Sequence, residues 1–297
     1  SPDYPPTWLL GVPWTAKYLL DGSTFEGLPE EKGYHTFFLL DKKIIEEGSI
    51  QDIPSGIHAS DWGKITTKDF VLFAHVNHSL YPNNLTGHFH HDSGSFVLFA
   101  DGRPFFVDCG REDYGVGGLS LHEKDYTGHN ICSVDSMNPE INMRTFFTAP
   151  FLESYGSRAP VIYTDYEHKS ITMSIEGYNR KKGVGKHTRR ILLKEGAMKI
   201  ADRIDGSGEH EITLLFHVSH EVDASLKEKN VFLDNGWNHY KLSFSVSADS
   251  LELIDGSVND VYGHCASEYG DHSFCSTLLY KKMVKLPWKI NTKLEKI

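Results

Sequence analysis

Histidine and aspartate side chains are concentrated in one short stretch of the chain. The segment GHFHHDSG places His88, His90 and Asp92 at alternate positions. Because alternate side chains of an extended chain point to the same side, His88 and His90 are expected about 6–7 Å apart on one face. Two imidazoles so placed can both bind a divalent metal ion, or one can bind the ion while the other transfers protons.

Two residues further along the chain extend this set. Asp108 and His129 stand in the segments FFVDCG and TGHNIC. Together with His90 they form a His, Asp, His set, which suits zinc with nitrogen and carboxylate ligands and a fourth position for water. The sequence has 17 histidines, so spacing alone leaves open that these are surface histidines or hydrogen-bonded core histidines.

Short apolar runs separated by Gly, Asp or Asn predict antiparallel strands from about Phe70 onward. Periodicity typical of helices is nearly absent. We therefore predict an all-β fold, a large antiparallel β-sandwich of two sheets over residues 61–297, with an irregular lead-in over residues 1–60 that packs on it. The runs are FVLFAHV, SFVLFA, PFFVDC, SITMSI, RRILLK, MKIADRI, HEITLLFHVS, VFLD, HYKLSFSV and LELIDG.

Two Asp-Gly pairs predict hairpin turns, one at Asp101-Gly102 and one at Asp205-Gly206. A regular ladder around the first turn would place Asp108 opposite about Ser95 rather than His90. The metal site therefore requires the strand to bend near Ser93-Gly94, where glycine makes a bulge or kink easy.

Composition limits the classes of partner. The hydrophobic content of 39% supports a real core, and the net charge of −10 argues against nucleic acid as a partner. The four cysteines follow no CxxC rhythm, which favours structural thiols over disulfides. No apolar run is long enough for a membrane span and no signal peptide is recognisable, although a trimmed, exported protein would look the same.

Three blocks in order resemble the C-terminal sandwich region of the heparinase II/III-like polysaccharide lyases. They are GHFHHDSGSFVLFADGRPFFVDCG, GHNICSV and HTRRILLKEGAMKIADRIDGSGEHEITLLFHVS. The shared elements are HxHxD, a strand ending in Asp-x-Gly, an HN pair, a His-x-Arg strand start and Asp-Arg-x-x-Gly. The resemblance covers about Ser60 to Ser219.

The resemblance implies roles for individual residues. His88 matches the active-site histidine that the sandwich contributes, and His90, Asp108 and His129 match the family's ligands of a zinc ion (Zn²⁺) that would be mainly structural. It also implies β-elimination on an acidic polysaccharide such as a glycosaminoglycan. In that reaction a base removes the C5 proton of a uronic acid, and an acid protonates the leaving C4 oxygen.

The sequence departs from complete family members in one respect. They carry a helical toroid before the sandwich, which donates a tyrosine acid/base and an asparagine or histidine that neutralises the carboxylate. We expect this chain to be the C-terminal part of such a protein, weak or inactive alone, with the toroid upstream and a periplasmic or secreted location. Tyr114 is a further candidate acid, although packing at the sandwich edge explains it as well.

A basic segment, YNRKKGVGKHTRR, suggests where an acidic glycan would bind. Arg180 and Arg189 are the predicted substrate contacts, because guanidinium groups pair with carboxylates and sulfates. A solvated loop is the alternative interpretation. Tyr178 and Trp237 are aromatic residues able to stack on a sugar ring, although an aromatic residue in a sandwich is a core residue in most cases.

Two other functions also fit these residues. The first is a noncatalytic glycan-binding or assembly domain that keeps the fold and the zinc site. The second is a cupin-like metal oxygenase, which also uses HxH and a later histidine. That class usually has a glutamate shortly after HxH, where this sequence has Asp92.

Overall fold

The structure is a computed structural model that describes residues 61–77, 89–113, 115, 117–141, 148, 150–151, 159–259, 261–266, 270 and 272–297. The chain divides into two compact units, Ser1–Ile57 and His58–Ile297. The predicted lead-in over residues 1–60 lies outside the described residues, so its packing on the sandwich stays a prediction. Within the described part of the chain, no helix is long and apolar enough to cross a membrane.

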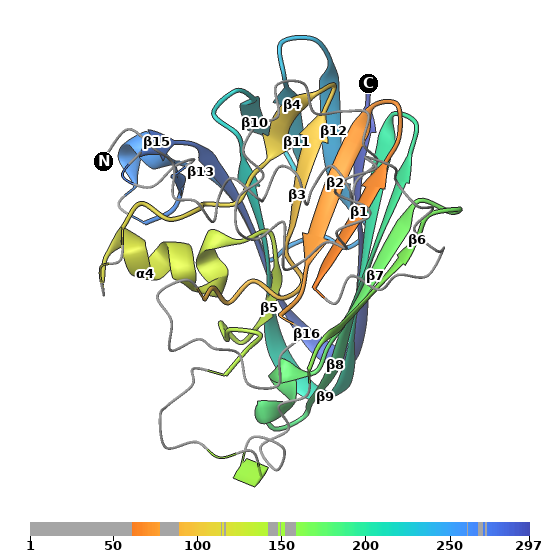
Figure 1. Cartoon of the computed structure of the whole chain (residues 1–297), viewed down its shortest axis with the longest axis vertical. Coiled ribbons are helices and arrows are strands. Elements are labelled where there is room, and N and C mark those ends of the chain that lie inside the picture. Colours follow the sequence, from red (N-terminus) through yellow and green to blue (C-terminus); the bar gives the residue numbers. More distant parts are fainter. Residues whose placement is uncertain are drawn as a thin grey trace, which may run out of the picture. The chain divides into compact units, whose positions relative to one another are not determined.

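Strands dominate the second unit (Figure 1), which confirms the predicted all-β class. The α-helix α4 (Leu119–Lys124) is short. The 3-10 helices are η1 (Tyr126–Gly128), η2 (Gly177–Arg180) and η3 (Gly256–Val258). The strands are β1 (Trp62–Thr66), β2 (Phe70–His75), β3 (Phe96–Ala100), β4 (Arg103–Phe106), β5 (Cys132–Val134), β6 (Val161–Asp165), β7 (Ser170–Ile175), β8 (Val184–Lys194), β9 (Ala197–Val218), β10 (Asp223–Lys227), β11 (Asn230–Asp234), β12 (His239–Phe244), β13 (Ser250–Asp255), β14 (His264–Cys265), β15 (Ser273–Phe274) and β16 (Ser276–Lys296).

Two long strands, β9 and β16, connect the parts of the main sheet. They pair antiparallel along nearly their whole length, from Ser276 opposite Val218 to Glu295 opposite Ala197. The hairpins β1–β2 and β3–β4 reach β9 through Phe106 opposite Val218, while β6, β7 and β8 extend from the first half of β9. On the far side, β12, β11 and β10 extend from the end of β16. In Figure 1, β1–β3 lie across the layer that contains β7, β8 and β9.

Side chains from both layers meet in one apolar core. Burial alternates along β2 and β8, as expected for strands with one face inward. Leu72 and Leu98 from the first layer belong to the same buried cluster as Ile171, Ile200 and Leu294 from the second. Two layers with their apolar faces together form the predicted sandwich.

The predicted turn at Asp101-Gly102 is confirmed. Both residues have positive φ, 53° and 79°, and Ala100 pairs with Arg103 across the hairpin. The ladder then contains a bulge, because Leu98 pairs with Phe106 while Phe99 pairs with Pro104. Such a bulge re-aims the strand that leads to Asp108.

The bend required at Ser93-Gly94 is present as well. Gly94 has φ 94°, and the N–H of Ser95 donates to the carbonyl of Asp92 at 2.8 Å, which closes a turn. The Gly94 N–H donates to the carbonyl of His75 at 2.9 Å. The histidine segment therefore leaves the ladder immediately before β3.

The predicted hairpin at Asp205-Gly206 is wrong. Strand β9 continues through this pair, and β8 and β16 pair with it on its two edges. Gly206 (φ 132°) and Gly208 (φ 94°) absorb an irregularity that also shifts the register of β16 between Leu286 and Trp288. The local turn signal is a bulged bend within one strand, because neighbours on both edges hold the chain extended.

Replacement of Gly94 by alanine should destabilise the domain by about 1–3 kcal/mol, because a side chain at positive φ is strained. The new Cβ would also lie 2.7 Å from Cδ1 of Ile175. Gly117→Ala is the matched control, since a Cβ there meets no atom within 4 Å. Urea denaturation measures both free energies of unfolding, and equal losses would contradict a special role for Gly94.

Candidate metal and histidine site

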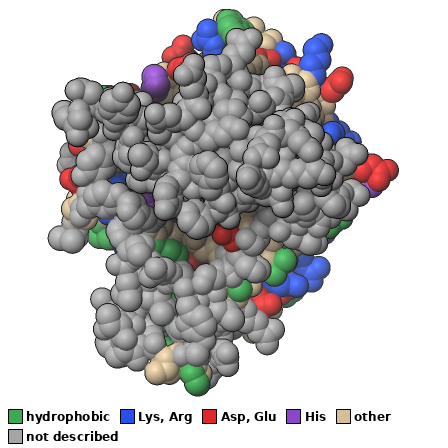
Figure 2. All heavy atoms as spheres, viewed as in Figure 1, with side chains coloured by type: hydrophobic (Ala, Val, Ile, Leu, Met, Phe, Trp, Pro, Cys, Tyr) green, Lys and Arg blue, Asp and Glu red, His purple; other side chains and the backbone are tan. Residues whose placement is uncertain are grey.

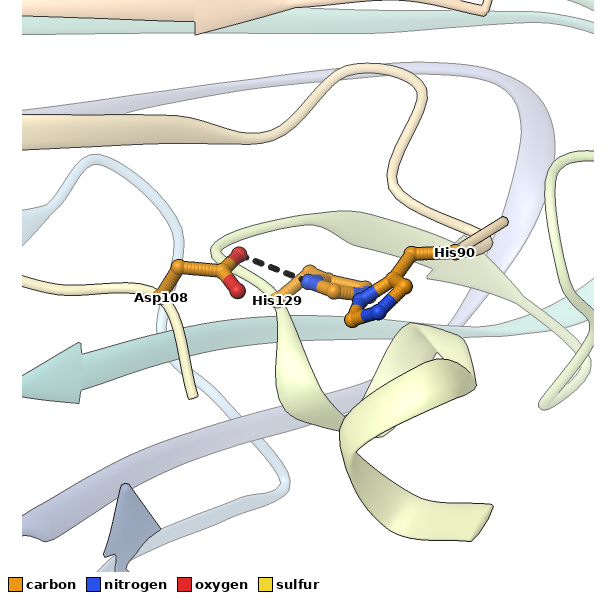
Figure 3. Close-up of side chains that lie close together, drawn as sticks. All are labelled: His90, Asp108 and His129. Carbon is orange, nitrogen blue, oxygen red and sulfur yellow. Dashed lines mark hydrogen bonds and ion pairs between the residues drawn. The ribbon is translucent and has the colours of Figure 1, made fainter. Parts of the chain in front are cut away.

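Three of the predicted site residues come together. His90 precedes the turn before β3, Asp108 follows β4, and His129 follows η1. One ligand atom from each lies within 4.8 Å of the other two. Figure 3 shows His129 between Asp108 and His90. His88, the fourth predicted residue, lies outside the described residues, and its catalytic role stays a prediction.

Asp108 and His129 form an ion pair. Oδ2 of Asp108 lies 2.7 Å from Nδ1 of His129, whose side chain is fully buried, while the Asp108 side chain is 33% exposed. Burial opposes the charge on His129, but the carboxylate outweighs it and raises the histidine pKa to about 9. The same pairing, with a hydrogen bond from the Gly110 N–H at 2.9 Å, lowers the pKa of Asp108 to about 2.

His90 provides the second imidazole. Its ring centroid is 5.4 Å from that of His129. Burial and the neighbouring charge of His129 lower the pKa of His90 to about 4, so its ring is neutral at pH 7, the form that binds metal ions. Nε2 of His129 is buried and has no hydrogen-bond partner among the described residues. An unpartnered nitrogen, a neutral imidazole and a carboxylate make this donor set suitable for zinc.

Asn130 fixes the loop that carries His129. Its Nδ2 donates to the carbonyls of Phe96 (2.7 Å) and Val107 (2.8 Å), and its Oδ1 accepts from the N–H of His217 at 2.7 Å. These bonds join the start of β3, the end of the β4 segment and β9. The sequence flagged Asn130 only as half of the HN pair, without a role.

Arg189 holds the same region from inside the protein. Its side chain is 1% exposed, and Nε lies 2.8 Å from Oδ1 of Asp202. Nη1 donates to the carbonyls of Gly94 and Asn130, both at 2.9 Å. Arg189 was predicted to contact substrate, but in this position its side chain supports the bend and the histidine loop and does not reach the surface.

The other predicted arginine has a different setting. Arg180 is half-buried and donates to the carbonyls of Asn138 (2.7 Å) and Pro139 (3.3 Å). The next residue, Glu140, accepts the Ser93 N–H at 3.0 Å. Arg180 thus supports a loop that contacts the bend, and its contact with substrate stays a prediction.

A polar network beside the bend was missed by sequence reasoning. Nδ1 of His75 lies 3.0 Å from Oδ2 of Asp92. Asn77 donates to Oδ1 of Asp92 at 2.8 Å and to Oε1 of Glu140 at 3.0 Å. Sequence reasoning assigned no partner to Asp92, because its partners come from β2 and a distant loop, which no local pattern indicates.

The remaining candidates divide between core and surface. Tyr178 is fully buried and donates to the carbonyl of Cys132 at 2.7 Å, so it is a core residue. Trp237 is exposed. His217, in the predicted strand HEITLLFHVS, is a core histidine as well, with Nδ1 3.3 Å from Sγ of Cys109 and 3.0 Å from Oγ1 of Thr277. Tyr114 lies outside the described residues. All four cysteines are free and buried.

A second group of possible ligands lies in the interior. Cys132, His187 and Asp202 offer atoms within 4.8 Å of one another, and all three are buried. His187 Nε2 is already 2.8 Å from Asp202 Oδ1, and the Arg189 guanidinium occupies the rest of that carboxylate. A metal ion would have to displace a paired cation, so we interpret this group as an ionic network.

Comparison with known families settles the relationship. A family described as "Heparinase II/III-like, C-terminal" matches residues 55–269. The chain belongs to this family. A search of proteins with curated functions finds no significant match.

Solved structures of heparinases share the fold of this family member. A heparan sulfate lyase HepC mutant from Pedobacter heparinus has TM-score 0.60 at 14% identity, over 86% of this chain and 38% of its own. The heparinase III-BT4657 gene product gives 0.59 at 14% identity over the same shares. A structure titled heparinase III gives 0.58 at 17%, over 77% and 33%. The chain thus spans little more than a third of these proteins.

Loss of the buried arginine should be far more costly than loss of an exposed one. Arg189→Met leaves Asp202 buried without its partner and is expected to destabilise the domain by about 3–5 kcal/mol. Arg203→Met removes an exposed pair with Asp205, also 2.8 Å long, and should cost less than about 1 kcal/mol. Similar denaturation midpoints for the two variants would refute the positioning role of Arg189.

Proposed function

We propose that this chain is the metal-binding β-sandwich domain of a lyase that cleaves acidic, uronate-containing polysaccharide by β-elimination. The observation that carries the proposal is the convergence of His90, Asp108 and His129, whose ligand atoms lie within 4.8 Å of one another, in a chain of the heparinase II/III-like family. The donor set suits a divalent cation, and binding would require His129 to release its proton.

Zinc would be held by His90, Asp108 and His129. Nε2 of His129 is free of a partner among the described residues, so for Asp108 to bind an ion there its carboxylate would have to leave Nδ1, because the two ring nitrogens point apart. A bound zinc ion would supply a fixed positive charge and coordinate bonds that cross-link three separate segments of the chain. Its role would be mainly structural, holding the bend at Gly94 and the histidine loop together.

His88 would be the contribution of this chain to the chemistry. A histidine with a pKa near 6.5 exchanges protons at neutral pH, as removal of the C5 proton or protonation of the C4 oxygen requires. It stands two positions before His90. Anchoring of His90 would therefore restrict where His88 can lie, which is how a supporting site sharpens a catalytic one.

Other groups must complete the reaction. A tyrosine acid/base and a side chain that neutralises the uronate carboxylate would come from a helical toroid domain outside this chain. The limited share of the heparinase structures that the chain covers is consistent with such a division. Arg180 is the proposed contact of this domain with the acidic substrate.

The test of the chemistry is an ultraviolet assay for unsaturated uronate, with a panel of acidic polysaccharides and the full-length parent protein. His88→Ala should lower turnover by about 10²–10⁴-fold, the usual contribution of a general acid or base. His168→Ala is the control, because that histidine is exposed on the β6–β7 turn. Unchanged turnover in His88→Ala would remove His88 from the mechanism, and binding without product would favour the noncatalytic alternative.

The test of the metal site is metal analysis of the purified chain. We expect stoichiometric zinc that is lost in His90→Ala and Asp108→Ala, together with a lower melting temperature, because metal binding contributes to folding. His239→Ala is the control, since His239 forms an exposed pair with Asp234 at 3.1 Å. Retained zinc in both ligand variants would refute the assignment, and iron in place of zinc would favour the oxygenase alternative.

A further inference from the structure

An exposed tryptophan stands on the turn between β11 and β12. Trp237 is 61% exposed, among the most exposed large apolar side chains described. The guanidinium carbon of Arg103 lies 4.1 Å from the centroid of its ring. The pair presents an aromatic surface and a cation side by side.

Several hydrogen bonds hold the turn that carries this tryptophan. Oδ1 of the buried Asn235 accepts the N–H groups of Trp237 (3.1 Å) and Asn238 (2.9 Å). Oδ1 of Asp234 accepts the Gly236 N–H at 2.8 Å, and Gly236 adopts φ 80°. The backbone at Trp237 is therefore fixed by side chains other than its own.

A single carboxylate joins this turn to the β3–β4 hairpin. Oδ2 of Asp101 accepts hydrogen bonds from Tyr240 Oη (2.6 Å), Asn238 Nδ2 (2.8 Å) and Asn235 Nδ2 (3.0 Å). Arg103 begins β4 directly after the Asp101-Gly102 turn. The Asp101 carboxylate thus joins the turn of Trp237 to the hairpin of Arg103 and holds the two residues near each other.

Arg103 keeps the capacity to pair with a further anion. Within the described residues, Arg103 forms one ion pair, with Glu221 at 4.0 Å, and the two side chains are 41% and 35% exposed. A pair of that length in solvent is weak. The planar fork of a guanidinium can bind a carboxylate or sulfate through two parallel hydrogen bonds.

Surface stacking of an arginine on a tryptophan is common and can serve stability alone. Stability of the turn does not explain the tryptophan. Asn235 and Asp101 hold the turn through bonds that do not involve the indole and would form with any residue at position 237. Fixing an exposed indole lowers the entropy cost of binding something to it.

We propose that Trp237 and Arg103 form a surface subsite for one acidic sugar ring, with the indole packed against the C–H face of the ring and the guanidinium paired with its carboxylate or sulfate. The subsite rests on the proposed substrate class but not on cleavage. Arg103 begins β4, whereas Asp108 follows the end of that strand, so the subsite and the metal site lie toward its opposite ends. The subsite would hold the polymer and take no part in cleavage.

Affinity gel electrophoresis of the full chain tests the subsite, with heparin, hyaluronan or neutral dextran in the gel. Trp237→Ala and Arg103→Gln should each weaken retardation by an acidic polymer at least about fivefold, and Trp237→Phe should restore part of it. Tyr166→Ala is the matched control, because Tyr166 is an aromatic residue of similar exposure, 55%, on another turn. Melting temperatures verify that each variant is folded.

The outcomes are distinct. Retardation that both Trp237→Ala and Arg103→Gln weaken supports the subsite; if it occurs with heparin alone the anion is sulfate, and if it occurs with hyaluronan as well the anion is carboxylate. Wild-type mobility in Trp237→Ala overturns it, as does a wild-type protein that neither acidic polymer retards. Failure of the proposed lyase function is separate, because it appears as absence of unsaturated product even where Trp237→Ala loses binding.

Discussion

The buried ion pair between Arg189 and Asp202 is the interaction on which the rest of the site depends. A guanidinium in the interior is tolerated only with a paired carboxylate and with its remaining N–H groups satisfied. Asp202 supplies the carboxylate, and the carbonyls of Gly94 and Asn130 satisfy Nη1. Since those carbonyls belong to the bend and to the histidine loop, the requirement to satisfy one charge fixes both segments against β8.

The charge states of His90, Asp108 and His129 depend on this fixed arrangement of the two segments. The bonds of Asn130 hold the neighbouring His129 beside Asp108, and this pair is charged while His90 is neutral. The Asp108 carboxylate stabilises the positive charge that the proton gives to His129. Replacement of that proton by zinc would release it, so affinity for the ion would rise with pH, as for any ligand that must be deprotonated. The bonds of Arg189 and the zinc ion would stabilise the same arrangement.

The sequence predicted those strands and turns that depend on residues close together in the chain. Period-two runs marked β2, β3 and β8, Asp101-Gly102 marked its turn, and the count from that turn required the bend at Gly94. Strand β16 was missed, because Pro287 and its many lysines hide the alternation that pairing with β9 reveals. The Asp205-Gly206 signal and the burial of Arg189 were misjudged for one reason: neighbours across the sheet, absent from any local window, decide both.

The two ends of the β4 segment have different physical characters. One end continues into Asp108 and the buried charges, where geometry is fixed by bonds to the interior. The other begins at a hairpin where Asp101 fixes groups that face solvent. A polymer bound at the solvent-facing end would have its neighbouring units held at raised effective concentration near the histidine end. A rigid strand connecting both ends is what would make such coupling possible, because a flexible connection would spread the held units over a larger volume.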